Sequence, residues 1–314
     1  FPRPPAGSKK TDTRHPSNYT RRPNRLFSKK NNTYSYFIMK FKLNKTQFLT
    51  EEHAAARDAR FIILPVPYER TTSYGKGTRN GPAAILRAST HLELWDEETR
   101  KESWKRGMVT LAPLDCSGSE KVFFRRLETE TARILSSCKG ISIFLGGEHS
   151  VTQGLLPPFQ EKYGDLSILH FDAHADLRPE YLGSARNHAC ALYPASRISR
   201  TVQVGIRSVA SDERQYAGAG KVKTYLMHES LDFDRLERAV LKDLSGTVYM
   251  TIDVDGFDPS VMPGTGTPQP GGFLWYDALK LFKAVCKKKK VVGLDVVEVA
   301  PIKGSHITEF NAAK

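Results

Sequence analysis

Six short apolar runs constrain the fold of this 314-residue chain more than any other feature. Each run is nearly continuous and is bounded by turn residues, as expected for strands that are buried on both faces of a sheet. The runs span residues 61–66, 141–145, 166–171, 202–206, 248–252 and 291–297. Between them, residues 120–138 and 232–244 place apolar side chains at helical spacing among charges. Strands that alternate with helices predict a three-layer α/β/α fold, in which helices cover both faces of a mainly parallel sheet.

The formal positive charge of the chain, +13, is concentrated at its beginning. Residues 1–38 carry nine Lys or Arg and one Asp, or +8, whereas the other 276 residues carry only +5. The first segment is also rich in Pro, Ser, Thr and Asn, a composition typical of disorder. We therefore expect residues 1–38 to be a disordered basic leader that is not part of the functional protein, and residues 39–314 to be a single domain. A transit peptide and a nucleic-acid-binding arm are the alternatives for the leader.

The composition of the chain excludes several classes of protein. A hydrophobic content of 39% with 10% aromatic residues is too high for a wholly disordered chain. No apolar run approaches the ~20 residues that cross a bilayer, so no membrane partner is expected. The four cysteines (Cys116, Cys138, Cys190 and Cys286) are scattered and form no CxxC pair. This pattern fits a reducing compartment, and we expect a cytoplasmic location.

Three of the predicted strands run directly into polar residues that are unusual beside a buried core. Gly-Gly-Glu-His follows the second run at 146–149, Asp-Ala-His-Ala-Asp follows the third at 172–176, and Asp-Val-Asp follows the fifth at 253–255. Ligands of open parallel α/β sheets bind beyond the carboxyl ends of the strands, so we expect one shared site. The polar residues of the last two segments alternate, which in extended backbone would place their side chains on one face.

The expected site combines two histidines with four aspartates, namely His149, His174, Asp172, Asp176, Asp253 and Asp255. Clustered buried carboxylates would be strongly destabilised without a cation. The set contains too much oxygen for a structural zinc site, and mixed carboxylate and imidazole ligands favour a harder ion such as Mn²⁺. Four carboxylates could also hold two such ions, with some of them bridging. Taken alone, Asp253 and Asp255 would equally fit the nucleophile loop of an aspartate-based phosphatase.

The three motifs resemble those of the ureohydrolase family, which contains the arginases, agmatinases and related guanidino hydrolases. The similarity extends through residues 263–268 and 293–301, includes Pro67 and residues 81–85, and covers roughly residues 60–314. It implies the arginase-type α/β fold, which a class of deacetylases shares. The motif around Glu298 argues against a deacetylase.

The resemblance implies a Mn²⁺-dependent amidinohydrolase with two ions per subunit, in which a hydroxide that bridges the ions attacks the guanidinium carbon. By motif position, one ion would be held by His149, Asp172, Asp176 and Asp253. The other ion would be held by His174, Asp172, Asp253 and Asp255. Asp172 and Asp253 would therefore bridge the two ions.

Two further residues match catalytic and substrate-binding positions of the family, and Asp176 is expected to join them in catalysis. Glu298 matches a glutamate that binds the guanidinium group, since a carboxylate can pair two N–H groups at once. His188 matches a histidine proposed to move protons, because an imidazole can protonate the leaving amine near neutral pH.

The resemblance predicts that the substrate is a small cationic guanidino compound. Arginase-type members carry an Asn two residues beyond the position of Asp176, where it reads the substrate α-carboxylate, but this chain has Arg178 there. The surrounding sequence resembles agmatinases, which predicts cleavage of agmatine to urea and putrescine in polyamine biosynthesis. Arg178 could instead bind a substrate carboxylate, as an arginase or guanidinobutyrase would require, or it could be an exposed structural residue.

Two other expectations rest on the resemblance. Family members are commonly trimers or hexamers, so a homo-oligomer is expected. For a different reason, namely that most of the excess positive charge lies in residues 1–38, no nucleic-acid partner is expected. Residues 308–314 resemble the beginning of the last helix of the family, so we expect the domain to be truncated there.

Overall fold

A parallel sheet of eight strands organises the computed structural model, which describes residues 41–50 and 52–314. The leader predicted at 1–38 lies outside the described residues. The strand order is β2-β1-β3-β8-β7-β4-β5-β6, and all neighbouring strands pair in parallel. The strands are β1 (Phe61–Val66), β2 (Met108–Thr110), β3 (Ile141–Gly146), β4 (Leu166–Phe171), β5 (Arg200–Ile206), β6 (Val222–Leu226), β7 (Thr247–Asp253) and β8 (Lys290–Val297).

All six predicted strands are present, with bounds within two residues of those expected. The sequence did not predict β2 and β6, which form the two edges of the sheet. β2 has only three residues, and the apolar character of β6 is interrupted by Lys223 and Thr224. An edge strand is not enclosed on all sides, so neither has the continuous apolar run of a central strand.

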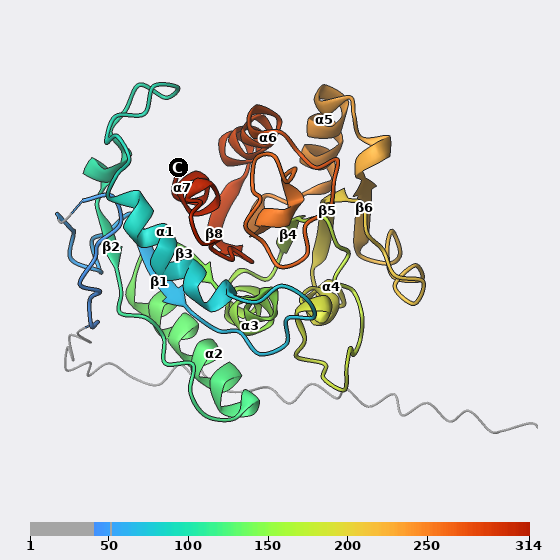
Figure 1. Cartoon of the computed structure of the whole chain (residues 1–314), viewed down its shortest axis with the longest axis horizontal. Coiled ribbons are helices and arrows are strands. Elements are labelled where there is room, and N and C mark those ends of the chain that lie inside the picture. Colours follow the sequence, from blue (N-terminus) through green and yellow to red (C-terminus); the bar gives the residue numbers. More distant parts are fainter. Residues whose placement is uncertain (1–40, 51) are drawn as a thin grey trace, which may run out of the picture. The chain divides into compact units, whose positions relative to one another are not determined.

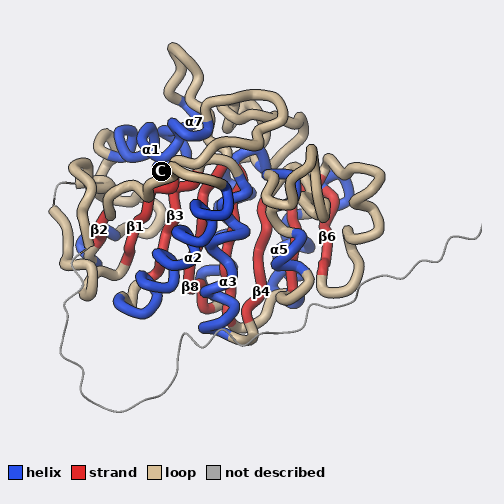
Figure 2. Tube along the Cα trace, turned by 90° about the horizontal axis from the view of Figure 1, so that it is seen from below, coloured by secondary structure: helices blue, strands red, loops and turns tan. Residues whose placement is uncertain are grey.

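Helices cover both faces of the sheet, as the three-layer prediction requires (Figure 1). They are α1 (Gly81–Ser89), α2 (Glu120–Ser137), α3 (Thr152–Tyr163), α4 (Tyr193–Ser196), α5 (Phe233–Asp243), α6 (Trp275–Lys288) and α7 (Ile307–Ala313). Residues of α2, α3 and α4 share one core cluster with the sheet, and residues of α1, α5, α6 and α7 share another. Figure 2 shows α2 and α3 lying side by side over the strands.

The two helices that the sequence predicts have clear local causes. Ser119 caps α2 and Asp232 caps α5, and each side chain accepts the backbone N–H three residues ahead. Phe123 and Leu127 of α2 lie four residues apart and are fully buried. Such spacing gives the helix one apolar face, and burying that face against the sheet stabilises it.

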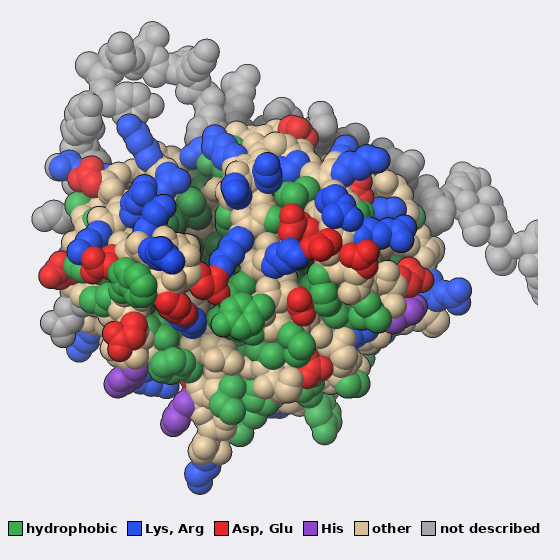
Figure 3. All heavy atoms as spheres, turned by 90° about the horizontal axis from the view of Figure 1, so that it is seen from above, with side chains coloured by type: hydrophobic (Ala, Val, Ile, Leu, Met, Phe, Trp, Pro, Cys, Tyr) green, Lys and Arg blue, Asp and Glu red, His purple; other side chains and the backbone are tan. Residues whose placement is uncertain are grey.

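The surface of the described residues is mixed in character. Figure 3 shows one face, on which Asp and Glu side chains lie among those of Lys and Arg, with hydrophobic side chains beside them. No helix in the described part of the chain is both long and apolar enough to cross a membrane.

Candidate metal centre and active site

Four adjacent strands in the middle of the sheet, β3, β8, β7 and β4, place the candidate site. His149 follows β3, Asp172 follows β4, Asp253 is the last residue of β7 and Glu298 follows β8. The carboxyl ends of parallel strands meet at one edge of the sheet. The four side chains therefore come together although their positions in the chain span 149 residues.

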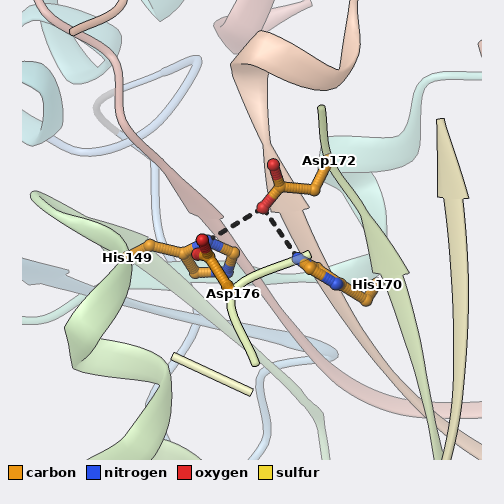
Figure 4. A group of neighbouring side chains, drawn as sticks. All are labelled: His149, His170, Asp172 and Asp176. Carbon is orange, nitrogen blue, oxygen red and sulfur yellow. Dashed lines mark hydrogen bonds and ion pairs between the residues drawn. The ribbon is translucent and has the colours of Figure 1, made fainter. Parts of the chain in front are cut away.

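The first cluster of side chains surrounds the ring of His149. Its Nδ1 lies 3.1 Å from Oδ2 of Asp172, 3.0 Å from Oδ2 of Asp176 and 3.3 Å from Oδ2 of Asp253. All four residues are buried. Figure 4 shows Asp172 between His149 and a second imidazole, that of His170.

The second cluster lies on the other side of Asp172. Nδ1 of His174 lies 3.0 Å from Oδ2 of Asp255 and 3.6 Å from Oδ1 of Asp172. The backbone of Asp255 also donates to Oδ1 of Asp253 at 2.9 Å. The two carboxylate oxygens of Asp172 therefore face different imidazoles, Oδ2 toward His149 and Oδ1 toward His174. All six predicted ligands thus lie in two clusters that share Asp172.

The six residues meet for a different reason from the one that the sequence suggested. Alternation in extended backbone would need β4 to continue through residues 172–176, but β4 ends at Phe171. Asp176 has a φ of 51°, in the left-handed region, and Asp255 lies in a 3-10 turn at Val254–Gly256. The side chains converge because an irregular segment follows β4 and a 3-10 turn follows β7, so the expectation of a shared strand face was wrong.

A bound cation would stabilise the buried charges of the two clusters. Burial raises the pKa of Asp253 well above its ordinary value, and the neighbouring carboxylates Asp255 and Asp172 raise it further. Nδ1 of His149 is a buried atom without a hydrogen-bond partner among the described residues, although three carboxylate oxygens face it. A divalent cation between these atoms would satisfy the nitrogen and compensate the carboxylates at once. The residues therefore fit a metal centre.

A cavity of about 110 Å³ opens onto the two clusters. It is lined by Ser73, His174, Asp176, Arg178, Tyr181, His188, Ala189, Asp253, Asp255, Thr267 and Glu298. Glu298 is buried and has a φ of 64°. Its backbone N–H donates to the carbonyl of Gly147 at 2.8 Å, and its Oε1 accepts the backbone N–H of His149 at 2.7 Å. Both ends of Glu298 are thus fixed to the segment that holds His149.

His188 brings a second titratable group to the same cavity. Burial lowers its pKa, and its Nε2 has no hydrogen-bond partner in the part of the chain that the structure describes. Its backbone N–H donates to Oγ1 of Thr71 at 2.9 Å, and that hydroxyl donates to Oε1 of Glu148 at 2.7 Å. The loop that contains His188 is therefore tied to the loop after β1.

Arg178 also lines the cavity but has partners of its own. Its Nε lies 3.5 Å from Oδ1 of Asp212, and its guanidinium carbon lies 4.2 Å from the centre of the Tyr181 ring. The side chain of Arg178 is 20% exposed. It is thus a partly buried residue at the cavity wall, rather than the exposed surface residue that was one alternative.

A row of buried polar residues, which the sequence did not indicate as functional, lies one layer below the candidate metal centre. Gln203, His170, Thr251 and Asp295 are register partners on β5, β4, β7 and β8. We call these four residues the polar row. Each interrupts an apolar run, and this interruption is the signal that could have identified them.

One part of the polar row holds Asp172. Nε2 of Gln203 donates to Nδ1 of His170 at 2.9 Å and to the carbonyl of Ala175 at 2.7 Å. Nε2 of His170 therefore carries the ring proton and donates it to Oδ2 of Asp172 at 2.7 Å. Asp172 is thus oriented from inside the sheet.

Comparison with known proteins agrees with this geometry. A profile of the Arginase family matches residues 59–314. An N(1)-aminopropylagmatine ureohydrolase from Synechocystis is 35% identical over 289 residues, which cover 88% of this chain and 93% of that protein. An agmatinase from Pyrococcus horikoshii is 34% identical over 263 residues, which cover 82% of this chain and 90% of that protein.

Solved structures show the same fold. The agmatine ureohydrolase of Thermoplasma volcanium aligns with a TM-score of 0.77 and 28% identity, over 85% of this chain and 90% of that chain. The proclavaminate amidino hydrolase of Streptomyces clavuligerus aligns with a TM-score of 0.79 and 26% identity, over 86% of this chain and 94% of that chain. The chain therefore belongs to the arginase family of ureohydrolases and is an amidinohydrolase.

Proposed function

We propose that the protein hydrolyses the guanidinium group of agmatine to urea and putrescine, with two Mn²⁺ ions held beyond β3, β4 and β7. The observation that carries the proposal is the orientation of Asp172, with Oδ2 toward His149 and Oδ1 toward His174. A carboxylate placed in this way is suited to be shared by two cations. A single cation would leave one of the two clusters without charge compensation.

The proposed ligand sets follow the two clusters. The first ion would be held by His149, Asp172, Asp176 and Asp253. The second ion would be held by His174, Asp172, Asp253 and Asp255. Mixed imidazole and carboxylate ligands suit Mn²⁺. Two such ions would lower the pKa of water and so supply the nucleophile near neutral pH.

The other residues of the cavity would bind and orient the substrate. Oε1 of Glu298 accepts the backbone N–H of His149, which leaves Oε2 available to a guanidinium N–H. The free Nε2 of His188 could pass a proton to the amine that leaves. Asp176 would act through the ion that it holds.

The surroundings of Arg178 indicate whether the substrate carries a carboxylate at the end away from its guanidinium group. The guanidinium of Arg178 already lies beside the Asp212 carboxylate and the Tyr181 ring, although its Nε makes no hydrogen bond with the described residues. Arg178 therefore has a negatively charged partner without a substrate carboxylate. This favours agmatine, which has none, over arginine or 4-guanidinobutyrate. N(1)-aminopropylagmatine is a second candidate, because the relatives with that name include the Synechocystis protein and a Thermus thermophilus protein that is 38% identical over 270 residues.

Urea release from a panel of substrates tests the proposal. The purified chain, supplied with Mn²⁺, is assayed with agmatine, N(1)-aminopropylagmatine, 4-guanidinobutyrate and arginine. We expect the highest kcat/KM with agmatine. A higher value with N(1)-aminopropylagmatine would select the second candidate. Turnover of only 4-guanidinobutyrate or arginine, the two substrates that carry a carboxylate, would select a guanidinobutyrase or arginase. No urea from any of them, with release of phosphate from a phosphate ester, would instead support the phosphatase alternative.

A further inference from the structure

A buried hydroxyl and a buried carboxylate of the polar row lie directly behind His149. Nε2 of His149 lies 2.9 Å from Oγ1 of Thr251, and Thr251 donates to Oδ1 of Asp295 at 2.6 Å. All three residues are buried, and Thr251 and Asp295 are register partners on β7 and β8. The contact with Thr251 is made by the nitrogen on the opposite side of the ring from the carboxylate cluster.

The direction of these hydrogen bonds follows from counting donors. Asp295 also accepts the hydroxyl of Tyr249 at 2.8 Å and that of Thr152 at 3.3 Å. Burial raises the pKa of Asp295, but the hydroxyls of Thr251, Tyr249 and Thr152 converge on it and stabilise its ionised form. A threonine hydroxyl has a single proton, and Thr251 gives that proton to Asp295. Thr251 can therefore only accept from His149, whose Nε2 must carry the ring proton.

We propose that Thr251 and Asp295 are positioning residues that hold His149 in its Nε2–H tautomer and so keep the Nδ1 lone pair directed at the carboxylate cluster. The inference rests on the proposed role of His149 as a metal ligand. It explains why a hydroxyl and a carboxylate lie inside the sheet at this position. It also explains why Nδ1 of His149 faces three carboxylate oxygens and has no hydrogen-bond partner within residues 41–50 and 52–314.

The opposite direction of the hydrogen bond has a distinct consequence. If Thr251 donated to Nε2, the ring proton would lie on Nδ1 and would point at the carboxylate oxygens. That nitrogen could then not bind a cation without losing its proton. The tautomer therefore decides whether His149 is ready to act as a ligand.

Mn²⁺ affinity separates the two possibilities. Thr251→Val keeps the shape of the side chain and removes the hydroxyl, and we expect Mn²⁺ to bind the full chain about 10- to 100-fold more weakly. Thr251→Ser keeps the hydroxyl and should restore affinity close to that of the wild type. Tyr249→Phe is the matched control, because it removes another hydroxyl from Asp295 but none from His149.

Several results would overturn the inference. Thr251→Val could bind Mn²⁺ as tightly as the wild type, or Tyr249→Phe could weaken binding equally. If Thr251→Val does not fold, ¹⁵N NMR of histidine-labelled wild-type protein loaded with Zn²⁺ decides instead. We expect a protonated Nε2 and a metal-bound Nδ1 for His149. A metal-bound Nε2 with a protonated Nδ1 would contradict the inference. Tight, Thr251-dependent Mn²⁺ binding without urea release would leave this inference standing while the proposed function fails.

Discussion

The hydroxyl of Thr71 accepts the backbone N–H of His188 at 2.9 Å and donates its own proton to Glu148 at 2.7 Å. Glu148 is fully buried and also accepts the backbone N–H of Thr71 at 2.7 Å. Three segments that lie far apart in the sequence therefore meet at one hydroxyl. The position of His188 in the cavity depends on this link.

Removal of the Thr71 hydroxyl should misplace His188. We expect Thr71→Val to lower kcat by about 10- to 100-fold, since small displacements of a reacting group are costly. Mn²⁺ content should not change, because Thr71 contacts none of the proposed ligands. Steady-state kinetics with metal analysis checks this, with Thr71→Ser as the variant that keeps the hydroxyl. Normal kcat in Thr71→Val would show that the link does not position a catalytic group.

Asp172 should be essential to both ions, because each of its oxygens faces a different imidazole. We expect Asp172→Asn to lose both metal ions and urea release together. Metal content after gel filtration, measured beside activity, tests this. Asp234→Asn is the control, since Asp234 is exposed and pairs with Lys280 on the surface. Retained activity in Asp172→Asn would contradict the shared-ligand role.

Glu298 should bind the substrate without holding a metal ion. Glu298→Gln keeps an oxygen that can accept the backbone N–H of His149 but loses the negative charge. We expect kcat/KM for agmatine to fall about 10- to 100-fold, because a hydrogen bond to a charged group contributes about 1.5–3 kcal/mol. Glu180→Gln removes the same charge from an exposed residue beside Tyr181 and should have little effect. Loss of Mn²⁺ in Glu298→Gln would assign Glu298 a different role.

Arg178 should matter little for agmatine. Its interactions with Asp212 and Tyr181 are partly exposed, and such pairs contribute little, so we expect Arg178→Ala to change kcat/KM for agmatine by less than about fivefold. The comparison is made with Arg178→Lys, which keeps the charge. A selective loss of turnover of 4-guanidinobutyrate in Arg178→Ala would instead show that Arg178 binds a substrate carboxylate.

Removal of divalent cations should destabilise the fold. Without them, the carboxylates of Asp172, Asp253 and Asp255 share a buried site and oppose folding. Saturating Mn²⁺ at about 100 times Kd would add roughly 2.7 kcal/mol per site to the free energy of unfolding. Scanning calorimetry after chelation, and again after Mn²⁺ is restored, measures this change in Tm. The same Tm in both samples would argue against a metal centre in the native protein.

The sequence predicts the central part of the fold well. Strands such as β4 and β7 are enclosed by neighbours and helices on all sides, so burial alone dictates their continuous apolar composition. The edge strands β2 and β6 lack this constraint and could not be recognised. The polar residues at the ends of β3, β4 and β7 were likewise identified because they are unusual beside a core.

The sequence did not predict how these residues meet. Asp176 reaches His149 through a left-handed backbone conformation, and Asp255 reaches His174 from a 3-10 turn. Turn conformations of this kind depend on contacts with distant segments. Thr251 and His170 looked like ordinary strand residues, because nothing in a single strand shows which side chain lies opposite.

The sequence by itself determined the chemistry of this protein: the parallel α/β fold, and the imidazoles and carboxylates available at the ends of its strands. The order of the strands was decided only by the tertiary structure, which places β8 between β3 and β7 and so brings Glu298 to His149. The division of the ligands into two clusters around Asp172 was decided there as well. The physical reason is that apolar pattern and residue type are properties of a segment, whereas hydrogen bonds and shared ligands are properties of pairs that only folding brings together.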